Sequence, residues 1–194
     1  MDSAKASAHS TSALTKLFKG IVNFVKRPKL LFWLFIALNL VPNFCLLFTE
    51  PLSGLGKIIL ILLPLGVYMV VFSLFKRAGL MQLILIPVLI LHAFQLVLFY
   101  LFGESVIAVD MFLNLPTTNA SEAGELLGNI WPSIIIVCVL YIPVIVLASI
   151  AVHHKVKRTA VFRKHMITWG IIFFIIGSGL VAFEKHRDNT YEVK

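Results

Sequence analysis

Charged residues are scarce in this sequence: they make up 13% of its 194 residues, against about 25% in a typical soluble domain. Apolar residues make up 59%, which is more than a soluble domain of this size could cover with polar surface. They form runs of about 20 residues, the length that a helix needs to cross roughly 30 Å of hydrocarbon. This composition excludes a disordered chain and a conventional soluble enzyme. It predicts an all-α, polytopic membrane protein.

Other features are missing as well. The two cysteines, Cys45 and Cys138, both lie within apolar runs, which predicts buried small apolar side chains and excludes a disulfide framework. No apolar run carries Asp, Glu, Lys or Arg at its centre, although an ion-coupled transporter usually needs such a charge. The adjacent His153 and His154 have cationic neighbours and point in different directions from a helix, so no metal site is expected there.

Five membrane-spanning helices are expected, over residues 30–49, 58–75, 80–102, 130–152 and 167–183. Thirteen of the 17 Lys and Arg residues lie in the alternate connections 1–29, 76–79 and 153–166. Because positive charge is retained on the cytoplasmic side, the N-terminus is predicted inside and the C-terminus outside. The excess of positive charge is therefore a topology signal, and nucleic acid is not expected as a partner.

The rest of the chain divides around this five-span domain of residues 29–183. Residues 1–12 are predicted to form a mobile tail, and residues 13–28 a short amphipathic helix at the membrane surface. Within the spans, four prolines predict bends: Pro42, Pro64, Pro87 and Pro143. His92 and Gln95 lie three residues apart, either as interhelical hydrogen-bonding groups, which is the favoured interpretation, or as the lining of a polar pocket.

The connection 103–129 breaks the pattern, because it is long and acidic and contains no Lys or Arg. Pro116 predicts a break between Phe112 and Asn119. Asn119 resembles an N-cap, and a short helix is expected from about residue 120 to residue 128. The sequence thus predicts a polar loop with one short helix on the outer side of the membrane.

Three polar residues of this loop, Asn114, Thr118 and Glu122, recur every four residues and would share one face of a helix. A carboxylate suits an ammonium group, and an amide and a hydroxyl suit phosphate oxygens. The three could therefore bind a zwitterionic lipid head group. Spacing alone favours a plainer interpretation, in which they are ordinary loop residues that cap turns.

The same stretch resembles the membrane domain of the bacterial phosphoethanolamine transferases that modify lipid A, the family that includes the mobile colistin-resistance enzymes. The family pattern D-M-x-x-N-x-x-x-T-x-x-x-E-A-x-x-L is matched by Asp110, Met111, Asn114, Thr118, Glu122, Ala123 and Leu126. The five-span topology with a polar outer loop between the third and fourth spans is similar too.

The resemblance implies a multi-pass protein of the bacterial inner membrane that takes part in lipopolysaccharide modification and polymyxin resistance. In the family, phosphoethanolamine passes from phosphatidylethanolamine to lipid A through a Thr nucleophile in a zinc-containing periplasmic domain. The residues corresponding to Asn114, Thr118 and Glu122 are implicated in binding the donor head group. Phosphatidylethanolamine, other membrane lipids and, through the full-length enzyme, lipid A are the implied partners.

One departure from the family limits this expectation. Residues 184–194 hold no plausible metal site and are expected to begin a linker to a catalytic domain that this chain lacks. No catalytic residue, metal site or cofactor is expected in this chain, and it is not expected to be active alone; zinc is expected in the missing domain. The alternatives are a stand-alone lipid-binding or carrier protein and a purely structural anchor.

Overall fold

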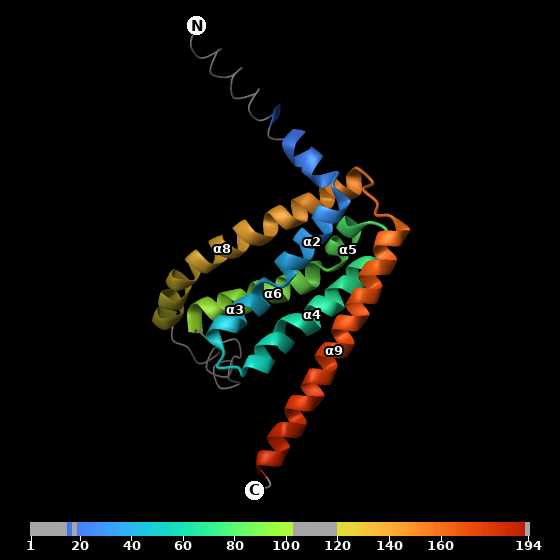
Figure 1. Cartoon of the computed structure of the whole chain (residues 1–194). Helices are drawn as coiled ribbons and strands as arrows, with labels where there is room; N and C mark the ends of the chain where they lie inside the picture. Colours follow the sequence, from blue (N-terminus) through green and yellow to red (C-terminus); the bar gives the residue numbers. More distant parts are fainter. Residues whose placement is uncertain (1–14, 17–18, 103–119, 193–194) are drawn as a thin grey trace.

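The computed structural model describes residues 15–16, 19–102 and 120–192, and in this part of the chain all regular structure is helical (Figure 1). Residues 19–25, which lie within the expected amphipathic segment, are helical. The helices that follow are α2 (Pro28–Asn39), α3 (Val41–Thr49), α4 (Gly54–Leu74), α5 (Ala78–Ile84), α6 (Ile86–Phe102), α8 (Ala120–His153) and α9 (Ala160–Glu192).

Three of these helices, α4, α8 and α9, contain unbroken stretches long and apolar enough to cross a bilayer. The pairs α2–α3 and α5–α6 pass the same test if each bent pair is one span, which gives up to five spans. An all-helical, polytopic architecture is thus confirmed. The side of the membrane on which each terminus lies stays a prediction.

The two breaks lie where the sequence predicts bends. Helices α2 and α3 meet at 40° and α5 and α6 at 62°, with Leu40 and Leu85 as the junction residues. Each junction lies two residues before a proline, Pro42 or Pro87. Proline has no amide proton and crowds the preceding turn, so the regular hydrogen-bond ladder stops there.

The other prolines do not interrupt their helices. Pro64 lies inside the continuous helix α4, and Pro132 and Pro143 lie inside α8. Helix α8 is 34 residues long, and its membrane-crossing stretch is Ile130–His153. The short helix expected at about 120–128 is therefore not a separate element but the start of this long helix. The break expected between Phe112 and Asn119 lies outside the described residues.

Helices α4 and α9 run antiparallel and pack closely through glycines (Figure 1). A Cβ atom on Gly66 would lie 2.8 Å from both the carbonyl oxygen of Gly170 and the amide nitrogen of Phe174. A Cβ atom on Gly177 would lie 3.2 Å from the Cβ of Leu63. Small residues let two backbones approach in this way, which is a common means of holding membrane helices together by dispersion.

A second group is formed by α5 and α6 packed on α8, where a Cβ atom on Gly79 would lie 2.7 Å from the carbonyl oxygen of Ala148. Helix α2 lies between the two groups and contributes aromatic side chains to their core. The ring of Phe72 in α4 lies 6.3 Å from that of Phe32 and 6.1 Å from that of Phe35, and all three side chains are fully buried. These rings join the α4–α9 pair to the rest of the bundle.

The surfaces that face away from this core are apolar, as a bilayer requires. Val139 on α8, for example, is 69% exposed. Cys138 beside it is exposed too, so the expectation that both cysteines are buried is wrong for this one. Cys138 lies at the edge of the contact between α6 and α8, where it lines a hollow with Leu89, Ala93 and Tyr141.

Arg158 in the α8–α9 connection and Arg163 in the first turn of α9 cap the C-terminal end of α4. The Arg158 guanidinium donates hydrogen bonds to the carbonyl oxygens of Phe72 and Phe75, the latter at 2.8 Å. Arg163 donates to the two carbonyl oxygens between these, those of Ser73 at 2.8 Å and Leu74 at 2.6 Å. Four carbonyl groups that a helix end would leave without partners are thereby satisfied.

The Arg158 side chain is only 6% exposed and lies over the ring of Phe32, with Cζ 4.8 Å from the ring centroid. Burial, and then the neighbouring charge of Arg163, lower the pKa of Arg158 to about 10, so the guanidinium stays charged at neutral pH. Lys155 and Lys157 of the same connection are exposed, whereas the charge of Arg158 is used inside the protein.

The glycine contact between α4 and α9 leads to a test of packing. We expect Gly66→Ala to lower the free energy of unfolding by about 1–3 kcal/mol, because the new methyl group meets backbone atoms that cannot move aside. Gly179→Ala in α9 is the matched control, since its Cβ would meet nothing within 4 Å. Unfolding in mixed detergent micelles measures both, and equal stabilities would contradict this account.

The capping arginine gives a second test. Replacing Arg158 with Gln leaves carbonyl groups of α4 without their charged donor, and we expect a loss of about 1.5–3 kcal/mol in the same unfolding measurement. Lys157→Gln removes the same charge from an exposed neighbouring position and is expected to be nearly neutral. A similar loss in both variants would show that charge, and not capping, matters.

Candidate functional site at the loop end of the bundle

The first turn of α8, which contains the candidate residue Glu122, lies at one end of the bundle, which we call the loop end. Here α3 ends at Thr49, α4 begins at Gly54, α6 ends at Phe102 and α8 begins at Ala120 (Figure 1). The connection 103–119 joins α6 to α8 at this end. The opposite end, with the α4–α5 and α8–α9 connections, carries the arginine caps.

Of the three predicted site residues, the structure places one. The backbone of Glu122 lies in the first turn of α8. Asn114 and Thr118 lie outside the described residues, so the structure does not bring the three together, and their common face stays a prediction. What the described residues add is that Glu122 stands at a helix N-terminus, where the peptide dipoles favour negative charge.

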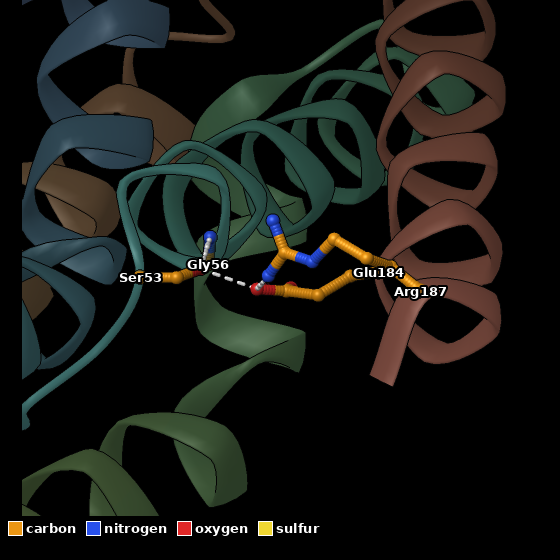
Figure 2. Close-up of polar contacts among 4 residues, drawn as sticks. All are labelled: Ser53, Gly56, Glu184 and Arg187. Atoms are coloured by element: carbon orange, nitrogen blue, oxygen red, sulfur yellow. Dashed lines mark hydrogen bonds and ion pairs between the residues drawn. The ribbon is translucent and has the colours of Figure 1, made fainter. Parts of the chain in front are cut away.

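A polar cluster at the same end joins α4 to α9, as Figure 2 shows. Ser53 is the N-cap of α4, and its hydroxyl oxygen accepts a hydrogen bond of 2.9 Å from the amide of Gly56. The same hydroxyl donates to a carboxylate oxygen of Glu184 in α9. That oxygen lies 3.8 Å from Nη2 of Arg187, one turn further along α9.

This cluster was missed in the sequence. Residues 184–194 were expected to begin a linker, whereas α9 continues as a helix through Glu192. At 33 residues it is about 50 Å long, well beyond the roughly 30 Å of hydrocarbon. A serine before an apolar run is a recognisable N-cap signal, but nothing in the sequence pairs Ser53 with a carboxylate 131 residues away.

Four polar residues within the spans form two side-chain contacts between helices. The side-chain amide of Asn39 donates to Gln82 Oε1 at 2.9 Å, and both residues are fully buried. The hydroxyl of Tyr68 in α4 lies 3.2 Å from Nε2 of His92 in α6. For His92, the favoured interpretation as an interhelical hydrogen-bonding group is thus confirmed.

A metal ion has no suitable ligand set in the described part of the chain. There, no group of three His, Cys, Asp or Glu side chains lies close enough to hold one. His153 and His154 stack edge to face with ring centroids 5.4 Å apart. We assign no chemical step to a metal held by these residues.

The Ser53–Glu184 contact can be tested by a double-mutant cycle. We expect Ser53→Ala and Glu184→Ala each to reduce stability, with a coupling energy of roughly 0.5–1 kcal/mol, because each removes the other's partner. Thr49→Ala combined with Glu184→Ala is the control, since Thr49 bonds to the Cys45 carbonyl of its own helix. Strict additivity of Ser53→Ala and Glu184→Ala would contradict the contact.

Comparison with known proteins is consistent with this architecture. A family model described as Phosphoethanolamine transferase EptA/EptB matches residues 65–187, from the middle of α4 into α9. A search of curated proteins and a search of solved structures each found no match. The matched range covers more than half of the chain and includes the Asn114–Glu122 segment. The chain therefore belongs to the phosphoethanolamine transferase EptA/EptB family, of which it carries a membrane domain.

Proposed function

We propose that this membrane domain binds phosphatidylethanolamine at its loop end and presents the head group for transfer to lipid A. The observation that carries the proposal is the family match across residues 65–187, which includes the whole N-x-x-x-T-x-x-x-E segment. The proposal places the protein in a bacterial inner membrane, with the loop end and the C-terminus on the periplasmic side.

The three site residues have distinct proposed roles. The Glu122 carboxylate pairs with the ammonium of the donor, while the amide of Asn114 and the hydroxyl of Thr118 hydrogen-bond to its phosphate oxygens. The charge of the connection supports this assignment. Residues 103–129 contain no Lys or Arg, and their carboxylates are Glu104, Asp110, Glu122 and Glu125. The ammonium of a zwitterionic head group is attracted to such a loop, whereas a purely anionic head group is repelled.

The transfer chemistry itself belongs to a catalytic domain with a threonine nucleophile. The nucleophile takes phosphoethanolamine from the donor, diacylglycerol leaves, and the group then passes to a phosphate of lipid A. Zinc bound in that domain would lower the pKa of the nucleophile and stabilise charge on the phosphoryl oxygens. The membrane domain's part is to hold the head group at the level of the bilayer surface, which replaces a diffusive encounter by a positioned one.

Donor binding can be tested on this chain alone, with Glu122→Gln as the variant. We expect binding of phosphatidylethanolamine to weaken about tenfold or more, because a charge-assisted hydrogen bond to the ammonium is lost. Binding of phosphatidic acid, which has no ammonium, should be nearly unchanged. Photo-crosslinking to lipid analogues in vesicles measures both.

Glu104→Gln is the matched control, because it removes the same charge from the same loop outside the N-x-x-x-T-x-x-x-E set. In a full-length enzyme, Glu122→Gln and Asn114→Ala should leave expression intact and strongly reduce lipid A modification, as measured by mass spectrometry of lipid A. Normal donor binding and normal modification in these variants would overturn the assignment.

A further inference from the structure

A groove lies between α3 and α4 at the loop end. Its volume is about 550 Å³, and its lining residues are Leu47, Phe48, Lys57, Ile58, Ile61 and Leu62. The Phe48 side chain is 88% exposed and that of Ile58 is 52% exposed. In a membrane such side chains contact acyl chains, so lipid rather than water would fill the groove.

Lys57 gives this apolar groove a polar end. It is the only Lys or Arg in α3 and α4, and it lies in the first turn of α4 ahead of a long apolar run. A lysine at this position extends its ammonium toward the phosphate layer while its methylene groups cover apolar surface. The rest of the lining reaches Leu62, five residues or about 7 Å deeper into the membrane. The groove therefore pairs one cation at head-group level with an apolar channel below it.

The Lys57 ammonium has no protein counter-charge among the described residues. The nearby carboxylate of Glu184 is engaged by Ser53 and Arg187 instead (Figure 2). No residue that lines the groove is acidic. A zwitterionic head group carries an ammonium, for which the groove lining offers no partner. An anionic head group carries only the phosphate charge, which Lys57 neutralises.

We propose that this groove binds one anionic phospholipid, with its phosphodiester on the Lys57 ammonium and an acyl chain along Phe48 and Ile58. Its lining shares no residue with the donor site proposed at Asn114, Thr118 and Glu122, and its lipid is of a different charge class. It would hold the α3–α4 hairpin at a fixed depth in the leaflet, next to the cluster that joins α4 to α9.

Site-specific photo-crosslinking tests the proposal on the full chain. p-Benzoylphenylalanine in place of Phe48 reports the lipid in the groove, and the same residue in place of Val139, which is 69% exposed on α8, reports bulk lipid. The probe is a vesicle of one part phosphatidylglycerol to three parts phosphatidylethanolamine. We expect phosphatidylglycerol to be enriched roughly fivefold at position 48 relative to position 139.

The enrichment at position 48 should disappear in Lys57→Gln and persist in Lys57→Arg. Lys164→Gln is the matched control, because it removes an exposed cation at the opposite end of the bundle, and it should leave the enrichment unchanged. An equal lipid ratio at positions 48 and 139 would overturn the proposal, as would enrichment that survives Lys57→Gln. Enrichment of phosphatidylethanolamine, or crosslinks to a second copy of the chain, would overturn it too.

Discussion

Hydrocarbon offers no hydrogen-bond partner to a peptide group, so each backbone amide and carbonyl of a spanning segment needs a partner within the protein. Continuous helices meet this requirement along most of the chain. It becomes harder to meet where α4 ends, because Phe72 and Ser73 are still fully buried there. Arg158 and Arg163 supply the missing donors. The chain can therefore turn tightly from α4 into α5 directly after these buried residues.

The hydrocarbon of the bilayer also determines which interactions hold the helices together. Lipid tails are as apolar as leucine, so helix association depends on close contact and a few hydrogen bonds. Glycines provide the close contact between α4 and α9 and between α5 and α8, and the Phe32, Phe35 and Phe72 rings join the two groups. The loop end is thus carried by helices whose positions are set by contacts deep in the bundle, and the first turn of α8 there holds the backbone of Glu122.

The all-helical, polytopic architecture was largely predictable, because the length of a spanning helix follows from the thickness of the bilayer. Bends at Pro42 and Pro87 were predicted correctly as breaks, yet Pro64 and Pro143 lie in helices that continue. Membrane helices tolerate proline when neighbouring groups satisfy the freed carbonyl, and the sequence does not show those neighbours.

Contacts between distant residues were beyond prediction. A charge count treats Arg158 like any other cation of the α8–α9 connection, although it caps α4 from 86 residues away. Glu184 was likewise assigned to a linker, because the sequence does not show its contact with Ser53. The candidate site was found through a motif that lies within the family match; it stays a prediction, because Asn114 and Thr118 lie outside the described residues.

The α9 residues that meet α4 have a regular spacing. Gly170, Gly177 and Glu184 contact it in turn, and each is seven residues after the one before. A heptad spacing brings one edge of a helix back to its neighbour at every second turn, with a drift of only about 20° that supercoiling absorbs. The Glu184 carboxylate that bonds Ser53 therefore lies on the same face of α9 as Gly170 and Gly177, the glycines that contact α4. One residue inserted between Gly177 and Glu184 would rotate that carboxylate by about 100°, away from Ser53, while the buried contacts stayed intact.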